Sequence, residues 1–214
     1  YSPTQPFPTK PLPFDRQGIA IDDLIDFTPE LRAEALEIVE SRARFGPIFS
    51  PPVLRGAEKP FIQVPGAGGG ASWQGSAIDP ETGRLFVSSS STSYVVELIK
   101  YDPPATIGYF TDPWGVGVGG PRGLPLFKPP YKRVTAIDLN TGDHAWQQPH
   151  GDGPRFDPAL ADLELPPLGG GGGLSSGPLV TPTLLIMNHG GRDYEDIAAG
   201  TRTISAYDKD TGDY

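Results

Sequence analysis

The chain has 214 residues and a net charge of −9, from 17 Lys and Arg against 26 Asp and Glu. This charge argues against a general nucleic-acid binder, which needs cations facing phosphates. The chain has no cysteine, which excludes disulfides, thiolate metal sites and a cysteine nucleophile.

No apolar run approaches the roughly 18 residues of a membrane-spanning helix, so we expect no transmembrane segment, and no signal peptide is visible. Glycine (28) and proline (26) together form about a quarter of the chain and break long helices. The 10 Phe, 8 Tyr and 3 Trp supply the apolar area that a disordered chain lacks. The composition therefore predicts a folded, loop-rich, β-dominated chain.

Residues 1–60 are expected to form an extended, proline-rich arm with one helix. The spacing of apolar residues predicts this helix over 28–45, with Thr28 as N-cap and Pro29 at the first helical position. Glu40 and Arg44 stand at the i, i+4 spacing of a favourable ion pair. The apolar stripe of the helix must pack on another element, so we interpret it as a docking helix. The stripe consists of Leu31, Ala35, Ile38, Val39 and Ala43.

From residue 61 onward the pattern changes to short strands, each bounded by Gly, Pro, Asp or Asn. Two long inserts interrupt it, at 102–131 and 147–173, and loops of this length are usually functional or cover something. The expected strands lie at 61–64, 85–87, 94–99, 134–137, 179–180 with 184–187, and 203–207.

One short pattern, Ala-x-Asp-x-x-Thr-Gly, occurs three times, at 77–83, 136–142 and 206–212. Three chance copies in a chain this short are improbable, so the pattern is a real repeat. Its chemistry is that of a hairpin turn. The Asp side chain accepts backbone N–H groups, and the Gly adopts a left-handed conformation. We therefore interpret these Asp and Thr residues as turn formers rather than catalytic acids or metal ligands.

The repeats predict hairpin corners of adjacent sheets that radiate around an axis. Three such units cannot close a β-propeller, which needs roughly four to eight blades. The fold class we expect is all-β: a partial β-propeller with one docking helix and long Pro/Gly-rich loops. Residues 61–214 would be consecutive blades carrying the two inserts.

The repeat resembles the tryptophan-docking motif of the quinoprotein dehydrogenases, the pyrroloquinoline quinone (PQQ)-dependent alcohol and glucose dehydrogenases. In that motif a Trp follows the Thr-Gly pair and packs between blades. Trp146 fits this position, whereas the first copy has Phe86 near it. Other segments also resemble the glucose dehydrogenase-like branch of this family. They lie at 1–13, 26–30, 66–73, 121–126, 128–131, 151–154, 165–169 and 177–181.

The resemblance implies a later part of an eight-bladed propeller with PQQ and a bound Ca²⁺ near its axis. It further implies oxidation of a sugar or alcohol, electron transfer to a quinone or cytochrome, and a periplasmic location. The remainder of the propeller, from the same gene or from a partner chain, would be a partner. The catalytic Asp and the Ca²⁺ ligands of the family belong mainly to earlier blades, so no catalytic or metal-binding residue is assigned in this chain.

Ser72 and Trp73 are the candidates for contact with the cofactor. Many relatives carry an Asn-Trp pair at this place, and Ser72 stands where that Asn approaches PQQ. A hydroxyl lacks the reach and the second group of an amide, which puts cofactor affinity in question. The alternative interpretation is a glycine-rich entry into a blade, with Trp73 as a packing residue.

Four other polar features remain as weaker candidates. His144, His150 and His189 lie far apart in sequence and lack metal-ligand spacing, so each is interpreted as structural or exposed. The segment 188–193 is polar and follows a strand, so it could face the axial funnel.

Two alternative functions stay open. The chain could be a non-catalytic propeller scaffold or assembly module, an interpretation that the serine at position 72 favours. It could also be a subunit that only completes the ring of another chain. The resemblance of fold alone does not decide between these functions and the enzyme.

Overall fold

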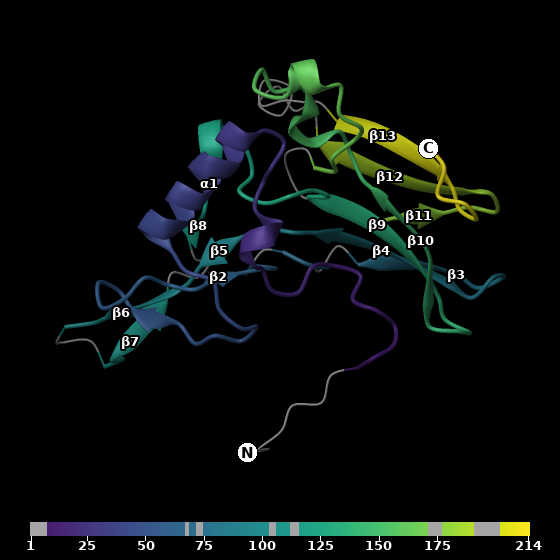
Figure 1. Cartoon of the computed structure of the whole chain (residues 1–214). Helices are drawn as coiled ribbons and strands as arrows, with labels where there is room; N and C mark the ends of the chain where they lie inside the picture. The colour runs from purple at the N-terminus through teal and green to yellow at the C-terminus, as the bar shows by residue number, and fades with distance from the viewer. Residues whose placement is uncertain are drawn as a thin grey trace.

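The computed structural model describes residues 8–66, 69–71, 75–102, 106–111, 116–170, 177–190 and 202–214. These residues form mostly short strands with one α-helix (Figure 1). Two stacked sheets carry the repeats, and two smaller sheets lie beside the helix at the other end of the molecule. The all-β, open-sheet architecture agrees with the predicted partial propeller. The connections within these described ranges contain four short 3₁₀ helices: η1 (Ile21–Asp23), η2 (Pro121–Gly123), η3 (Gly153–Phe156) and η4 (Ala161–Leu163).

The largest sheet has four antiparallel strands in the spatial order β10-β9-β4-β3. They are β3 (Ser76–Asp79), β4 (Arg84–Ser90), β9 (Lys132–Asp138) and β10 (Asp143–Pro149). The first repeat closes the β3–β4 hairpin and the second closes the β9–β10 hairpin. The expectation that each repeat marks a different sheet is therefore wrong for these two repeats. Both hairpins belong to one four-stranded sheet, and each of them is closed by a copy of the turn sequence.

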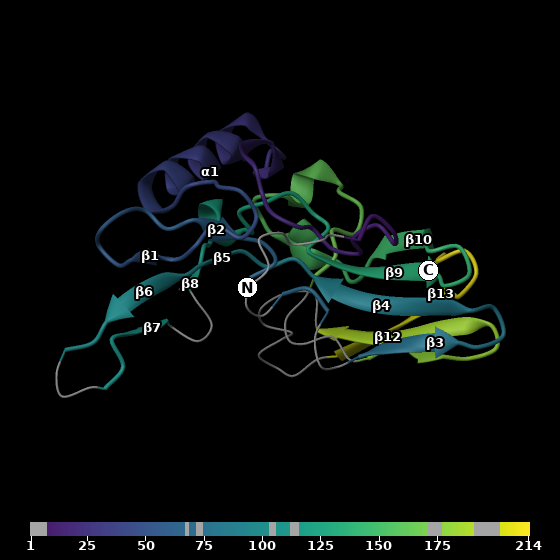
Figure 2. The same ribbon diagram turned by 90° about the horizontal axis from the view of Figure 1, so that it is seen from below.

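The second sheet has three antiparallel strands in the order β11-β12-β13. They are β11 (Leu179–Val180), β12 (Leu184–Gly190) and β13 (Arg202–Asp208). The third repeat begins within β13 and forms the turn that follows it. Within the described ranges, β13 pairs with β12 alone, so its other edge is open. The second sheet stacks on the first, as two views show (Figures 1 and 2).

The interior between the two sheets is built from alternating residues that face the neighbouring sheet. Phe86 and Trp146 pack with their ring centroids 5.8 Å apart, and both are buried. Phe86 is thus a core neighbour of Trp146 in the same sheet. The cluster comprises Phe86, Val134, Ala136, Trp146, Leu185, Met187 and Tyr207.

Trp146 links the two sheets directly. Its indole Nε1 donates a hydrogen bond to the carbonyl oxygen of Lys209, 3.1 Å away, in the turn of the third repeat. Gly212 of the same turn lies against the indole ring, and a Cβ on this glycine would come within 2.7 Å of Trp146. The contact therefore needs the repeat's glycine as well as the tryptophan of the preceding unit.

Ion pairs join the first and third repeats across the same interface. Lys209 Nζ lies 2.7 Å from Asp79 Oδ2, and both side chains are only 5% exposed. Arg84 Nη1 lies 2.6 Å from Asp210 Oδ1 and also approaches the carbonyl oxygens of the turn. The hydrogen bond from Lys209, followed by that from Thr82, lowers the pKa of Asp79 from 3.8 to about 2. The interface is thus apolar in its interior and ionic at its turn end.

The three turns have the predicted chemistry. Asp138 Oδ1 accepts the backbone N–H of Asn140 at 2.7 Å, and Asp208 Oδ1 accepts that of Asp210 at 2.8 Å. The backbone N–H of Asn140 lowers the pKa of Asp138, and those of Thr211 and Asp210 lower the pKa of Asp208. The repeat glycines Gly83, Gly142 and Gly212 have φ of +70°, +74° and +79°. The hydroxyls of Thr82, Thr141 and Thr211 also form hydrogen bonds within their turns. The interpretation of the Asp and Thr residues as turn formers is confirmed.

The predicted helix is α1 (Pro29–Arg42), with Thr28 Oγ1 accepting the backbone N–H of Leu31 at 3.2 Å. It ends three residues earlier than the predicted boundary. Arg44 therefore lies beyond the helix, and its carboxylate partner is Glu58, 2.5 Å away, instead of Glu40. The buried residues of the stripe are Leu31, Ala35, Val39 and Ala43.

The helix packs on the first long insert. Leu124 and Leu126 are almost fully buried in the cluster that contains the helix stripe. Arg122 of the same insert holds Glu34 of α1 with an Nη2–Oε1 distance of 2.6 Å. The apolar stripe of the helix thus packs on this insert, as expected of a docking helix.

The strands at 61–64 and 94–99 do not join the four-stranded sheet. They belong to two three-stranded side sheets, in the orders β2-β5-β8 and β1-β6-β7 (Figure 2). The second of these includes a parallel pair, β1 with β6. The bounds are β1 (Val53–Leu54), β2 (Ile62–Gln63), β5 (Tyr94–Val95), β6 (Glu97–Lys100), β7 (Tyr109–Thr111) and β8 (Val116–Gly117).

The described part of the N-terminal arm crosses the face of the four-stranded sheet that points away from the second sheet. The carbonyl oxygen of Phe14 accepts hydrogen bonds from Gln147 Nε2 (3.2 Å), Thr135 Oγ1 (3.4 Å) and Ser89 Oγ (3.5 Å). His144 Nε2 lies 2.9 Å from the carbonyl oxygen of Leu12. The arm is thus fastened by polar side chains from three adjacent strands.

Candidate functional site

The two predicted cofactor contacts, Ser72 and Trp73, lie outside the described residues. The segment that leads to them is described and is held on the end of β4. Gly70 and Ser90 exchange backbone hydrogen bonds of 2.7 and 3.3 Å, and Gly66 N donates to Thr92 O at 2.8 Å. This places the glycine-rich segment beside the strand end that is farthest from the repeat turns.

The glycines of this segment are required by its packing. A Cβ on Gly69 would come within 2.5 Å of Thr92 Oγ1 and 2.9 Å of the Ser90 carbonyl oxygen, and Gly70 has φ of +72°. The space that a Cβ would fill is therefore already occupied by β4 and the residues after it. The described glycines fit a tight strand contact, and they do not by themselves form a cradle for PQQ.

A buried polar network lies next to this end of β4. Ser91 Oγ donates to Asp15 Oδ1, and Arg133 Nη2 donates to Ser91 Oγ at 2.7 Å and to the Pro130 carbonyl at 2.7 Å. Arg133 also lies 3.5 Å from Asp15, with both side chains at most 10% exposed. Burial lowers the pKa of the Arg133 guanidinium, while the Asp15 carboxylate opposes this shift. The arm, β4 and β9 thus meet in one hydrogen-bonded cluster.

A cavity of about 240 Å³ lies next to this network. Arg16 of the arm, Ser91 to Ser93 after β4, and Lys128 and Tyr131 of the first insert supply its polar lining. The apolar part of the lining is Ile19, Val64, Val118, Pro125, Leu126 and Phe127. The cavity therefore adjoins the glycine segment, because Thr92 is shared by both.

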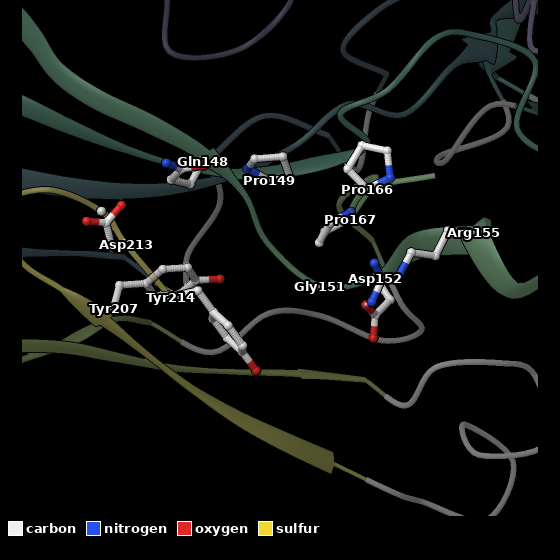
Figure 3. A pocket seen from close by; sticks show the side chains of 11 residues that line it. Gln148, Pro149, Gly151, Asp152, Arg155, Pro166, Pro167, Tyr207, Asp213 and Tyr214 are labelled. Atoms are coloured by element: carbon white, nitrogen blue, oxygen red, sulfur yellow. The ribbon is translucent and has the colours of Figure 1, made fainter. Parts of the chain in front are cut away.

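A larger cavity, of about 570 Å³, lies between the end of β10, the second insert and β13 (Figure 3). Its aromatic wall is Tyr207 and Tyr214, whose ring centroids are 5.6 Å apart. Arg155 and Asp152 form an ion pair of 2.7 Å at its opposite wall. The end of β13 and the turn that follows it, at Gly212 and Asp213, complete this lining.

The histidines take structural positions where the structure describes them. His150 is fully buried between Tyr207 OH (2.8 Å from Nδ1) and the Asn188 carbonyl oxygen (3.0 Å from Nε2). His144 holds the arm, as described above. The side chain of His189 and residues 191–193 fall outside the description, so the suggestion that 188–193 faces an axial funnel stays a prediction.

Among the residues that the structure describes, no three His, Asp or Glu side chains gather in a way that could hold a metal ion. In the same residues, no helix has the length and apolar character needed to cross a membrane.

Sequence reasoning missed the Asp15–Ser91–Arg133 network and the cavity beside it. One signal was available: residues 88–93 form an unbroken run of Ser and Thr directly at the end of a strand. Hydroxyls in such a run have to find partners if they are buried, which indicates a polar site. The partners Asp15 and Arg133 are far away in the sequence and could not be identified from it.

Comparison with known proteins places these features in context. A family model described as "PQQ: Glucose/ethanol/alcohol dehydrogenase, beta-propeller domain" matches residues 1–214. Glycerol dehydrogenase large subunit of Gluconobacter oxydans (strain 621H) is 27% identical over 176 residues, 70% of this chain and 23% of the relative. The protein of that name from Gluconobacter thailandicus is 29% identical over 136 residues, 51% of this chain and 18% of the relative.

A third similar protein is quinate/shikimate dehydrogenase (quinone) of Acinetobacter baylyi (strain ATCC 33305 / BD413 / ADP1). It is 28% identical over 109 residues, 42% of this chain and 14% of the relative. The chain thus spans less than a quarter of the length of each of these three relatives.

Proposed function

The chain belongs to the PQQ-dependent glucose/ethanol/alcohol dehydrogenase β-propeller family, and we propose that it is part of a quinoprotein dehydrogenase that oxidises a sugar or alcohol. The observation that carries the proposal is the family match over the whole chain, 1–214. Two of the similar proteins are named for glycerol, so a polyol is the alcohol that we propose as substrate.

The proposed cofactors are PQQ and Ca²⁺, with Ser72 and Trp73 as the contacts of this chain to PQQ. PQQ supplies the hydride acceptor when it is bound. The described residues support the site indirectly: the Gly70–Ser90 and Gly66–Thr92 backbone bonds hold the segment that carries both residues. We propose no catalytic residue here, since the resemblance puts the catalytic Asp in earlier blades.

We further propose that Trp146 is the tryptophan-docking residue of the family. Its hydrogen bond to the Lys209 carbonyl and its contact with Gly212 support this assignment. In the domain organisation that we propose, residues 1–60 form the arm with its helix and residues 61–214 form consecutive blades with inserts at 102–131 and 147–173. The remainder of the propeller, from the same gene or a partner chain, would complete the ring.

We propose a periplasmic location and a quinone or cytochrome as electron acceptor. The large-subunit names of the two Gluconobacter relatives support the existence of a further subunit. No nucleic-acid partner is proposed, because the net charge of −9 opposes binding to phosphates.

The proposal is tested on the protein at its full natural length. PQQ and Ca²⁺ are added, and the quinone absorbance and the reduction of an artificial dye are followed with glycerol and glucose as substrates. Dye reduction that requires PQQ, Ca²⁺ and a substrate supports the function. If neither the quinone absorbance nor calorimetry detects PQQ binding, the dehydrogenase function is contradicted and the non-catalytic scaffold is favoured.

Ser72 offers a matched variant. Replacing Ser72 with Asn restores the amide that many relatives carry, and an additional hydrogen bond of about 1 kcal/mol corresponds to about fivefold tighter binding. We therefore expect Ser72→Asn to lower the PQQ dissociation constant by about that factor, and Trp73→Ala to raise it. Equal PQQ affinities in the parent protein and both variants would show that these residues do not contact the cofactor.

A further inference from the structure

The arm that crosses the four-stranded sheet buries little apolar surface. Within the described ranges, residues 8–17 belong to no helix or strand, and residues 8–13 are exposed. Leu12, the largest apolar side chain among these six, is 64% exposed. Ile19, in contrast, is buried in the cluster that contains the helix stripe. The core therefore holds the chain from Ile19 onward, whereas the arm before it depends on polar contacts.

Several of these polar contacts are weak. The carbonyl oxygen of Phe14 is shared by three side-chain donors at 3.2 to 3.5 Å, although a carbonyl oxygen has only two lone pairs. Gln147 Nε2 makes a shorter bond, 2.7 Å, to Thr135 Oγ1, and this bond does not involve the arm. The Lys10–Asp143 ion pair is more than half exposed and contributes little. The sheet thus keeps much of its hydrogen bonding when the arm is absent.

Buried polar atoms without a hydrogen-bond partner gather where the arm meets the sheet. The described residues contain eight such side-chain atoms, and five of them lie in this region: Asp15 Oδ2, Arg16 Nη1, Thr92 Oγ1, Tyr131 OH and Arg133 Nε. These atoms are enclosed too tightly for water to reach them, which is unfavourable for a polar group. Lifting the arm returns the groups of Asp15, Arg16 and Arg133 to water. The closed position of the arm therefore carries a cost that opening relieves.

We propose that residues 8–17 act as a latch that opens at Gly18 while the two stacked sheets stay folded. Gly18 has φ of +80°, a conformation that glycine adopts without strain, and it separates the arm from the buried Ile19. Segments with few buried apolar contacts are the ones that open locally in native proteins. Opening removes Arg16 from the wall of the 240 Å³ cavity and exposes this end of β4 to solvent. The latch does not depend on the proposed dehydrogenase function.

The test uses a single thiol as a probe of opening. Residues 1–214 contain no cysteine, so an introduced one is identified by its own tryptic peptide. Ser89→Cys places the thiol beneath the arm. Ser88→Cys is the matched control, because the two serines are 2% and 3% exposed and neighbouring side chains of a strand point to opposite faces. The protein at its natural length is treated with iodoacetamide under native conditions, and labelling is followed by mass spectrometry. We expect Ser89→Cys to be labelled at least about tenfold faster than Ser88→Cys.

A second substitution changes the latch itself. Asp15→Ala removes the carboxylate that binds Ser91 and Arg133. Loss of a hydrogen bond to a charged group corresponds to about tenfold or more in an equilibrium constant, so labelling of Ser89→Cys should accelerate by about that factor. Labelling of Ser88→Cys should not change. Lys10→Met, which removes the exposed ion pair of the arm, is the control and should leave both rates unchanged.

Three results would overturn the proposal. The first is equal labelling of Ser88→Cys and Ser89→Cys, which would mean that both thiols are exposed only by global unfolding. The second is faster labelling of Ser88→Cys, which would mean that the sheets separate first. The third is a Ser89→Cys rate that Asp15→Ala leaves unchanged. If either serine variant does not fold, Thr135→Cys and Val134→Cys form an equivalent pair on β9, both fully buried in the parent protein and on opposite faces of the sheet.

Discussion

Asp79 and Lys209 form the most buried ion pair that the described residues contain, and it makes stability depend on pH. The pKa of Asp79 is about 2 in the folded protein against an ordinary 3.8. A carboxyl whose pKa falls on folding contributes stability that is fully present above its unfolded pKa. This contribution is lost as the pH falls from about 4 through about 2.

We therefore expect Lys209→Met to lower the free energy of unfolding at neutral pH and to flatten its fall between pH 4 and pH 2. The variant removes the hydrogen bond that contributes most to the lowered pKa of Asp79. The measurement is urea unfolding at a series of pH values. Lys10→Met is the control, since the Lys10–Asp143 pair is more than half exposed and should matter little. Parallel pH profiles for the parent protein and Lys209→Met would contradict the assignment.

Trp146 contributes packing and a hydrogen bond to the contact between the sheets, and two substitutions separate them. Trp146→Ala should lower the free energy of unfolding by about 3–5 kcal/mol, the usual range for a large aromatic side chain removed from a core. Trp146→Phe keeps much of the packing but loses the bond to the Lys209 carbonyl, and should cost about 1 kcal/mol more than the lost packing alone. Denaturant unfolding measures both. Tyr101→Ala on the exposed hairpin should change little, and an equally small effect of Trp146→Ala would contradict the docking role.

At this scale the sequence predicted local chemistry and missed distant partners. Asp, Thr and Gly of each repeat act within one turn, so their spacing alone defines their bonds. Lys209 occupies a variable position of the repeat, and its partner Asp79 is 130 residues away. The pair could not be predicted, since it depends on how two sheets stack rather than on any local pattern.

Among the elements, the repeat turns allow a matched comparison of two glycines. Gly142 and Gly212 have nearly the same φ, +74° and +79°, but their surroundings differ. A Cβ on Gly142 would meet only the flexible side chain of Lys10 at 3.2 Å, whereas a Cβ on Gly212 would meet the Trp146 ring at 2.7 Å.

Both alanine substitutions should lose about 1–2 kcal/mol from the left-handed backbone. Gly212→Ala should lose additional stability, because the Trp146 ring has to move, and it should also shift the tryptophan fluorescence. Thermal unfolding and fluorescence spectra of the two variants measure these effects. Equal losses with unchanged spectra would show that Trp146 does not rest on Gly212 in solution.

The elements themselves were predictable where a long periodic pattern or a turn sequence defined them. The helix and the strands that flank the repeats fall into this class. In the side sheets the strands at 61–64 and 94–99 were predicted, but β1 and β8 were not, because strands of two residues carry too little sequence pattern. The pairing within the side sheets was not predicted either, since it depends on contacts between distant segments. The same applies to the cavity, whose lining comes from three segments that only the fold brings together.

For the whole molecule, the sequence indicated open sheets and the structure shows where one of them lies. The number of repeats did not equal the number of sheets, because one four-stranded sheet uses the same turn twice. What the repeats did predict correctly is incompleteness: the two stacked sheets leave an unpaired edge at β13 in the described chain. An unpaired edge offers its N–H and C=O groups to any other strand.

The isolated chain of residues 1–214 should therefore self-associate through β13. Ile204 on this strand is 74% exposed and adds an apolar side chain to the open edge. Ile204→Lys places a charge there, which disfavours pairing between edges, and should reduce the association seen by sedimentation velocity. Ile107→Lys is the control, since Ile107 is also exposed (56%) but lies near β7, and this substitution should leave the association unchanged. If the unsubstituted chain sediments as a stable monomer, the open-edge interpretation is contradicted. If both lysine variants reduce the association equally, the association is due to general surface hydrophobicity and not to β13.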